Sequence, residues 1–551
     1  MTGSSPFLAY TPAALAFGTS GLRGLVADIT DLEAYINVKG ALRYLSSIGD
    51  VAPGGGVVLA GDLRPSTDRI MRACAQAIVD SGCGVENAGK IPTPALILRG
   101  MSTGRPGVMV SGSHIPFDRN GIKLSKSAGE ILKTDEKGIT AEVERVRAEE
   151  YARTAADTAF TAAGAFKRSP DLPAIEPAAE EAYVRRYRES FARGGLSGLR
   201  VLVYQHSAVG RDILPRILRE LGAEVVTAGR AETFVPIDTE NITDEMLDRL
   251  DALVAAEAQG GPIHAVVSTD GDSDRPLVAA VLPAGRVRFL PGDLLGIVVA
   301  EYLRADAAAV PISANDAVER RMSERHVLLR KTKIGSPYVI AALDELGHEG
   351  RHPRIVGWEA NGGFLLGSDV VLPAGALAAL PTRDATLPIL ANLFAAAERG
   401  VALSQLWDEL PARFGRSGLI DGVPVAVSAA ILAHLVPAGD TVEVAFDAAG
   451  NALVLAGPAA AAWRERRATL ARFFGPAAGF DGIARINVLD GVRVYFHNGD
   501  VAHVRPSGNA PQLRIYANSD SQARADAIVA AGLREPDGIL RLMEKAFPAV
   551  G

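Results

Sequence analysis

The chain has few cysteines, no long apolar run and no large excess of charge. Cys74 and Cys83 are its only cysteines among 551 residues, too few for a disulfide framework or a four-cysteine zinc site. No apolar run approaches the roughly 20 residues that a membrane helix needs, and residues 1–10 lack the pattern of a secretory signal. The formal net charge of −7 is not that of a nucleic-acid binder. We therefore expect a soluble cytoplasmic enzyme that binds neither membranes nor nucleic acid.

Length and composition predict several globular domains. Apolar residues make up 48% and charged residues 22% of the chain, a typical globular balance, and the length suggests about three to five domains. Short apolar runs separated by helical patterns recur in three rounds, which predicts three mixed α/β domains. The last part has clustered strands and an Asn-Gly hairpin signal, which indicates a smaller α+β domain. The predicted domains are 1–160, 175–290, 291–412 and 413–551, with an Ala- and Pro-rich linker near residues 150–180.

A serine follows the buried strand predicted at 107–111. Ser113 and His114 lie in the polar loop after this strand, where α/β proteins place reactive groups. Lys123 comes after an Asn-Gly pair, which we interpret as a turn that folds the lysine back towards Ser113. A serine that accepts a phosphoryl group needs cations and a proton acceptor nearby. The segment therefore suits a phosphoserine site, although an ordinary surface turn has the same pattern.

Three aspartates alternate after another predicted apolar strand. In extended backbone, Asp270, Asp272 and Asp274 would place their carboxylates on one side, and hard cations such as Mg²⁺ take oxygen ligands of this kind. A calcium EF-hand loop starts in the same way but requires Gly at its sixth position and Glu at its twelfth, where this chain has Arg275 and Val281. A solvated acidic turn is disfavoured because three close carboxylates repel one another without a cation.

Two further polar loops are candidates for substrate binding. Residues 505–514 supply two arginines, a serine hydroxyl and backbone N–H groups beside a glycine, a combination that can form a phosphate cradle. Residues 356–364 place Glu359 after a predicted strand and before Gly-rich backbone, where it could bind sugar hydroxyls. A plain β-turn and a hairpin with an exposed glutamate remain the alternatives for these two loops.

Two familiar motifs are excluded. Residues 84–90 match most of a Walker A loop, but Ile91 stands where Mg²⁺ needs Ser or Thr, and Pro92 follows where the helix should begin. The nine histidines show no His-Glu-x-x-His spacing. We therefore expect neither ATP binding at residues 84–90 nor a zinc hydrolase of that type.

The loops that carry Ser113, the three aspartates, Glu359 and Arg505 resemble those of the α-D-phosphohexomutase superfamily, and so do residues 17–24, Phe-Gly-Thr-Ser-Gly-Leu-Arg-Gly. This superfamily includes phosphoglucomutase, phosphomannomutase and phosphoglucosamine mutase. The resemblance covers nearly the whole chain, with five motifs in the family's order. It departs from the family pattern at Ile115, Trp358, Asn361 and Asn509. The implied catalytic residues are Ser113, His114, Lys123 and Arg23. The implied Mg²⁺ ligands are Ser113, Asp270, Asp272 and Asp274. The implied substrate-binding residues are Arg275, Glu359, Asn361, Arg505, Ser507, Gly508, Asn509 and Arg514.

The fold implied by the resemblance is four domains around a central cleft, three mixed α/β domains and a C-terminal α+β domain. The implied reaction moves phosphate between O1 and O6 of a hexose through phosphorylated Ser113 and a bound hexose 1,6-bisphosphate that turns end for end. Mannose phosphate is favoured, and glucose phosphate and glucosamine phosphate remain open. The oligomeric state and the pathway stay unassigned.

Two rival functions use the same scaffold. A non-catalytic sugar-phosphate sensor would need neither Ser113 nor the three aspartates, so their presence argues against it. A serine-based phosphatase would hydrolyse the phosphoserine and would not need a second phosphate cradle in another domain.

Overall fold

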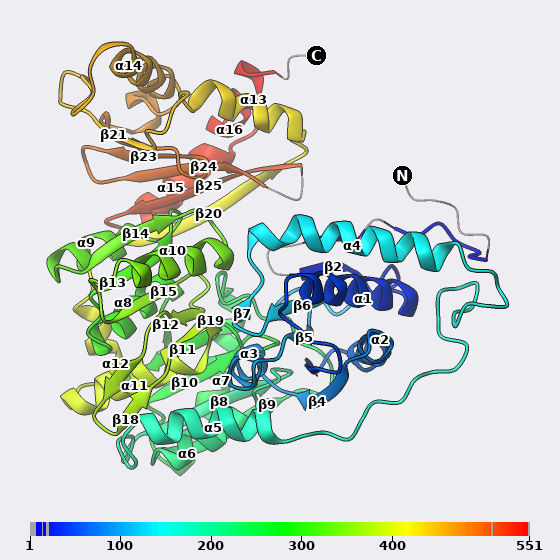
Figure 1. Cartoon of the computed structure of the whole chain (residues 1–551). Coiled ribbons are helices and arrows are strands. Elements are labelled where there is room, and N and C mark those ends of the chain that lie inside the picture. Colours follow the sequence, from blue (N-terminus) through cyan, green and yellow to red (C-terminus); the bar gives the residue numbers. More distant parts are fainter. Residues whose placement is uncertain (1–6, 14, 18–20, 508–510, 549–551) are drawn as a thin grey trace. The chain divides into compact units, whose positions relative to one another are not determined.

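Residues 16–151 form a mixed sheet with flanking helices in the computed structural model, which describes residues 7–13, 15–17, 21–507 and 511–548 (Figure 1). The strand order is β1-β2-β6-β5-β3-β4, with β7 paired to β6. Strands β3, β4 and β5 are parallel, and β6 returns antiparallel to β5. The bounds are β1 (Ala16–Phe17), β2 (Gly21–Leu25), α1 (Asp31–Ser47), β3 (Gly56–Gly61), α2 (Thr67–Asp80), β4 (Gly84–Lys90), α3 (Thr93–Thr103), β5 (Gly107–Val110), β6 (Arg119–Lys126), β7 (Gly129–Glu130) and α4 (Lys133–Tyr151).

The second sheet follows the linker and has the order β12-β11-β10-β8-β9. Strands β8, β9 and β10 are parallel, whereas β11 is antiparallel to β10, so the chain must reverse in the short loop between β10 and β11. Helix α7 begins where the Thr243 side chain accepts a hydrogen bond from the backbone of Met246, an ordinary N-cap. The bounds are α5 (Ala178–Ser190), β8 (Arg200–His206), α6 (Ile213–Glu220), β9 (Glu224–Arg230), α7 (Asp244–Glu257), η1 (Ala258–Gly260), β10 (Ala265–Thr269), β11 (Pro276–Val281) and β12 (Val287–Phe289).

The third sheet has the order β14-β13-β15-β16-β19. Strands β13 and β15 are parallel, and β16 is antiparallel to both β15 and β19. The bounds are α8 (Gly292–Tyr302), β13 (Ala307–Pro311), α9 (Asp316–Glu324), β14 (Leu328–Thr332), α10 (Ser336–His348), β15 (Ile355–Trp358), β16 (Phe364–Leu366), β17 (Val370–Leu372), β18 (Gly375–Leu377), β19 (Leu380–Asp384), α11 (Thr386–Arg399) and α12 (Leu403–Asp408).

The C-terminal sheet is antiparallel, with the order β20-β25-β24-β23-β22-β21. The expected hairpin at residues 497–500 joins β23 to β24, and Tyr495 pairs with Val501. The bounds are β20 (Phe414–Asp421), α13 (Val425–Leu435), β21 (Glu443–Ala445), α14 (Gly457–Ala471), η2 (Pro476–Ala478), β22 (Ile483–Asn487), β23 (Val492–Phe496), β24 (Val501–Pro506), β25 (Gln512–Ser519), α15 (Gln522–Leu533) and α16 (Ile539–Ala546). Three mixed α/β domains and a C-terminal α+β domain are thereby confirmed.

The domains group into two compact units. The first consists of residues 1–310, 325–330 and 335–409, and the second of residues 311–324, 331–334 and 410–551. Within the second unit, Arg413 donates from Nε to Asp316 of α9 at 2.8 Å, and Arg493 donates to the carbonyl oxygen of Ala314 at 3.0 Å. The second unit is therefore built from three separate stretches of chain. Among the helices of the described ranges, none is both long and apolar enough to span a bilayer.

Candidate active site

Ser113 lies in the loop between β5 and β6 and is fully buried. Its φ of +56° is in the left-handed region, a conformation that costs a serine about 1–3 kcal/mol and that clusters at functional sites. Ser113 Oγ donates a hydrogen bond to Asp270 Oδ2 at 2.6 Å and lies 3.3 Å from His114 Nδ1. The loop therefore directs the hydroxyl of Ser113 towards Asp270, the first of the three aspartates.

Arg64 holds this loop in place by binding its backbone carbonyl oxygens. Its guanidinium donates to four carbonyl oxygens of residues 113–119, at 2.6–3.2 Å, and its Nε donates to Asp62 Oδ2 at 3.1 Å. The side chains of Arg64 and Asp62 are both inaccessible to solvent, and the ring of Phe234 covers the guanidinium at 3.9 Å. A Cβ on Gly112 would lie 2.7 Å from Arg64 Cζ, so the packing of this clamp requires glycine there.

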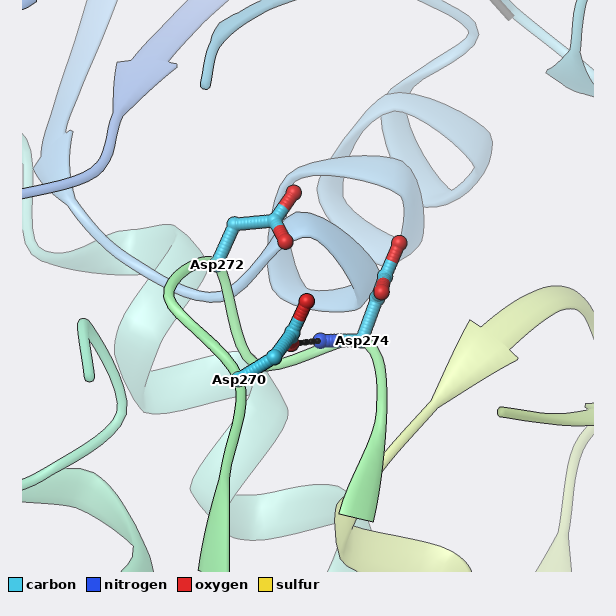
Figure 2. Close-up of side chains that lie close together, drawn as sticks. All are labelled: Asp270, Asp272 and Asp274. Atoms are coloured by element: carbon cyan, nitrogen blue, oxygen red, sulfur yellow. Dashed lines mark hydrogen bonds between the residues drawn. The ribbon is translucent and has the colours of Figure 1, made fainter. Parts of the chain in front are cut away.

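The three aspartates converge in the turn between β10 and β11 (Figure 2). Candidate ligand oxygens of Asp270, Asp272 and Asp274 lie within 4.8 Å of one another. The extended backbone predicted here is wrong. Ser273 has a φ of +58°, and Asp270 Oδ1 accepts the backbone N–H groups of Asp274 and Arg275, each at 3.2 Å. A closed turn, not strand alternation, brings the carboxylates together.

Both oxygens of Asp270 accept hydrogen bonds, whereas Asp272 and Asp274 each have one oxygen that does and one that does not. Asp272 Oδ2 accepts hydrogen bonds from Lys123 Nζ at 2.5 Å and from Thr93 Oγ1 at 2.7 Å, and Asp274 Oδ2 accepts from Lys123 Nζ at 2.9 Å. The Oδ1 atoms of Asp272 and Asp274 are buried without a hydrogen-bond partner in the described chain. Buried polar atoms are normally paired, and a hard cation with oxygen ligands would satisfy them. The residues present therefore fit a divalent cation.

Lys123 reaches the aspartates from inside the first sheet. The expected Asn-Gly turn is wrong, because Asn120 and Gly121 lie within β6, whose antiparallel pairing with β5 brings Lys123 opposite Met109. Burial opposes the charged form of Lys123, but the carboxylates of Asp272 and Asp274 outweigh it and raise its pKa. Lys123 is therefore a permanent cation in this site.

Burial is the largest cause of the pKa shifts of Asp270 and His114. Burial, and then repulsion from Asp272 and Asp274, raises the pKa of Asp270 well above its usual value. Burial, followed by the charges of Arg275 and Arg23, lowers the pKa of His114 to about 3. The imidazole is consequently neutral at physiological pH. Burial also opposes the charged forms of Asp272 and Asp274, but Lys123 at both and Arg383 at Asp274 outweigh it and lower their pKa values.

Two arginines expected at the site lie beside the turn that carries the three aspartates. Burial, followed by the nearby charges of Arg275 and Arg383, lowers the pKa of Arg23, which lies on β2. Arg275 Nε lies 3.7 Å from Asp274 Oδ1 but is buried without a hydrogen bond to any described residue. A concentration of guanidinium groups with an unpaired donor suits an anionic ligand.

Glu359 follows β15 directly and is buried. Its Oε2 accepts a hydrogen bond from Arg383 Nη1 at 3.0 Å. Asn361 uses its side-chain oxygen to accept the backbone N–H of Gly363 at 2.9 Å, and its carbonyl oxygen accepts from Thr239 Oγ1 at 2.7 Å. The side-chain oxygen and the carbonyl of Asn361 thus shape the loop, which leaves the amide nitrogen for other contacts.

The expected phosphate loop belongs to the second unit. Arg505 on β24 and Arg514 on β25 are direct cross-strand partners, a placement in which like charges repel. Arg505 donates from Nε to Asp490 at 3.0 Å, and Arg514 Nε is buried without a partner in the described chain. The Ser507 amide donates to the carbonyl of Gln512 at 2.9 Å, so this N–H is not open. Gly508 and Asn509 lie outside the described residues.

Comparison with known proteins identifies the family. The four domain models of phosphoglucomutase/phosphomannomutase match in order: domain I at residues 14–150, domain II at 181–281, domain III at 291–414 and the C-terminal domain at 455–534. The chain is 38% identical, over 94% of its length, to a phosphomannomutase of Sinorhizobium fredii (strain NBRC 101917 / NGR234), of which it covers 98%. The chain belongs to the phosphoglucomutase/phosphomannomutase family.

Other relatives agree with this membership. A phosphomannomutase of Salmonella muenchen is 37% identical over 93% of the chain and is 94% covered. A solved phosphoglucomutase/phosphomannomutase family protein from Burkholderia thailandensis has the same fold, with a TM-score of 0.63 at 18% identity over 97% of this chain and 98% of the other. The expected superfamily and the expected class of enzyme, a phosphohexomutase, are confirmed.

Two residues of the site were missed by sequence reasoning. Arg64 comes shortly after the buried strand β3, and its spacing from Asp62 was a usable signal for a charged pair at a strand end. Arg383 stands in Leu380-Pro-Thr-Arg-Asp384, which resembles no motif. Its contacts depend on the position of β19 beside the turn that carries the three aspartates, which the sequence does not reveal.

Proposed function

We propose that this phosphohexomutase acts chiefly on mannose phosphate, interconverting mannose 1-phosphate and mannose 6-phosphate in the cytoplasm through phosphorylated Ser113 and Mg²⁺. The proposal rests on one observation: Ser113 Oγ lies 2.6 Å from Asp270 in a trio of aspartates that has two unpaired buried oxygens. The preference for mannose is supported by 37–38% identity to two phosphomannomutases. Glucose phosphate and glucosamine phosphate are the competing substrates.

Asp270, Asp272, Asp274 and Ser113 would hold the cation. When bound, Mg²⁺ supplies positive charge that offsets the charge of a transferring phosphoryl group. Lys123 offsets part of the charge of Asp272 and Asp274 by binding their Oδ2 atoms, which leaves the Oδ1 atoms for the cation. Its raised pKa suits it to charge compensation and not to accepting a proton. Arg23 and Arg275 would contact the phosphate oxygens of the substrate.

Residues of the site can also transfer the proton that the substrate hydroxyl loses. The bond between phosphorus and Ser113 Oγ breaks as the bond to the substrate hydroxyl forms, and the hydroxyl proton must finally reside on Ser113 Oγ. His114 Nδ1, 3.3 Å from this oxygen, is neutral at physiological pH and can pass the proton. The resulting hexose 1,6-bisphosphate would stay bound, turn over and return its other phosphate to Ser113.

Substrate recognition would involve the remaining candidates. Glu359 and Asn361 would bind sugar hydroxyls. The phosphate that does not react would bind in the second unit, where two opposed arginines and an unpaired Nε suit an anion. The residues assigned to that phosphate are Arg505, Ser507, Gly508, Asn509 and Arg514.

A coupled assay of the purified chain tests the proposal. We expect isomerisation of mannose 1-phosphate to exceed that of glucose 1-phosphate and glucosamine 1-phosphate, and to be nearly abolished in Ser113→Ala while the fold persists. Intact-mass measurement should show one phosphoryl group on the wild-type chain and none on the variant. Release of inorganic phosphate without isomer would instead indicate a phosphatase, and full activity of Ser113→Ala would exclude the phosphoserine.

A further inference from the structure

Arg383 is a buried guanidinium that binds one carboxylate from each of two loops. On β19, its Nη2 and Nε lie 2.9 and 3.2 Å from Asp274 Oδ2, and its Nη1 lies 3.0 Å from Glu359 Oε2. Only 7% of its side chain is exposed. One rigid planar group therefore spans the turn with the aspartates and the loop that begins at Glu359, and a lysine could not reproduce this geometry.

The surroundings are built to hold this side chain. A Cβ on Gly363 would lie 2.7 Å from Arg383 Cδ, so the glycine makes room for the arginine stem. Glu130 accepts from Thr382 Oγ1 at 2.6 Å and from Ser336 Oγ at 3.0 Å, which fixes its carboxylate. Glu130 and Arg383 also line one cavity of about 10 Å³, room for roughly one water molecule. A third carboxylate, that of Glu130, therefore lies near Arg383 in addition to those of Asp274 and Glu359.

These contacts decide which carboxylate oxygens stay available. Lys123 and Arg383 both bind Asp274 through Oδ2, so Oδ1 is left buried without a hydrogen bond, 3.7 Å from Arg275 Nε. At Glu359, Arg383 takes Oε2, and none of the described residues donates to Oε1. The same guanidinium therefore turns one oxygen of Asp274 towards the candidate cation site and frees one oxygen of Glu359.

We propose that Arg383 is a positioning residue that couples the cation site to sugar recognition, by fixing Asp274 and Glu359 at once. This inference rests on the proposed function for its sugar half, and on the aspartate trio alone for its cation half. Lys123, Arg275 and Arg383 are cations that face the three aspartates. Loss of the planar guanidinium would release Asp274 and Glu359 together. Cation binding and sugar binding should then weaken together.

The experiment compares Arg383→Gln and Arg383→Lys in the full-length chain. Titration calorimetry with Mn²⁺, without substrate, should show several-fold weaker binding by Arg383→Lys, which keeps the charge but cannot bridge both carboxylates. Arg383→Gln, which also removes a positive charge beside the cation site, should lose less affinity. Both variants should show a KM for mannose 1-phosphate raised about 10-fold and a reduced preference for mannose over glucose phosphate. Glu130→Gln, which removes the negative charge near Arg383 and keeps the size of the side chain, should shift both quantities in the same direction by less.

Arg354→Gln is the matched control, because Arg354 makes a similar two-point contact with Asp306 at 2.8 and 2.9 Å away from the loops. It should change neither quantity. Wild-type or tighter Mn²⁺ binding by Arg383→Lys would overturn the proposal, as would an unchanged sugar preference in an active enzyme. If the wild type turns over no hexose phosphate, the proposed function fails, and the Mn²⁺ titration still decides the cation half. If Arg383→Gln does not fold, Arg383→Lys and Glu130→Gln decide it.

Discussion

Replacement of Arg64 by lysine should slow the chemical step without weakening substrate binding. The guanidinium makes five side-chain hydrogen bonds, four of them to carbonyl oxygens of the Ser113 loop. A lysine has three donors on one nitrogen, so at least two acceptors lose their partner. Each buried acceptor left without a hydrogen bond costs about 1–3 kcal/mol, so two of them cost about 2–6 kcal/mol. The loop can reduce this cost by moving until its carbonyl oxygens reach water or another donor.

Movement of the loop displaces Ser113 Oγ. Because misplacement of a reacting atom by about 1 Å can cost about 100-fold in rate, we expect kcat to fall about 10- to 100-fold. Arg64 contacts backbone and Asp62, so KM for mannose 1-phosphate should change by less than about threefold. Steady-state kinetics and melting temperature measure both effects. Arg69→Lys, in the same domain but on a partly exposed contact with Asp31, is the control. Wild-type kcat and melting temperature in Arg64→Lys would refute the clamp.

Three further predictions concern the cation, the phosphate and acid stability. Asp272→Asn removes a ligand charge and should weaken Mn²⁺ binding several-fold or more in calorimetry; an unchanged Kd would exclude Asp272 as a ligand. Arg505→Ala should reduce kcat/KM about 10- to 100-fold, since a charge-assisted contact contributes about 1.5–3 kcal/mol, with Mn²⁺ affinity unchanged; normal kinetics would remove Arg505 from the phosphate site. Burial lowers the pKa of His503 to about 3, so below pH 6.5 the unfolded chain binds a proton that the folded chain does not. The stability held above pH 6.5 is therefore lost as the pH falls towards 3, by up to about 2 kcal/mol at pH 5. His503→Gln should show a smaller drop in melting temperature between pH 7.5 and 5, and an equal drop would contradict this cause.

Local patterns in the sequence were enough to place the loops that carry the candidate chemistry. Strands β5, β10 and β15 end within one residue of where their apolar runs predicted, so Ser113, Asp270 and Glu359 could each be assigned to a strand end. This works because a buried strand reads as a continuous apolar run and polar residues must follow it.

Local rules failed where a distant part of the chain sets the conformation. Gly121 suggested a turn, but it is a strand residue whose absent side chain admits the carbonyl oxygens of Leu22 and Ser111, at 2.6 and 2.8 Å from where a Cβ would stand. Arg383 has no motif because its two partners, Asp274 and Glu359, lie in other segments more than 20 residues away in sequence. Such contacts cannot be derived from spacing along the chain.

The make-up of the second unit has a practical consequence for dissecting this protein. A fragment that starts near residue 410 would lack the stretch 311–324 that belongs to the same unit. The solvent-inaccessible side chain of Arg413 would lose Asp316, and Arg493 would lose the carbonyl of Ala314, leaving two buried cations short of partners. Expression of the C-terminal domain by simple truncation should therefore yield poorly folded material. A circular permutant or a graft that restores residues 311–324 is the better starting point for isolating it.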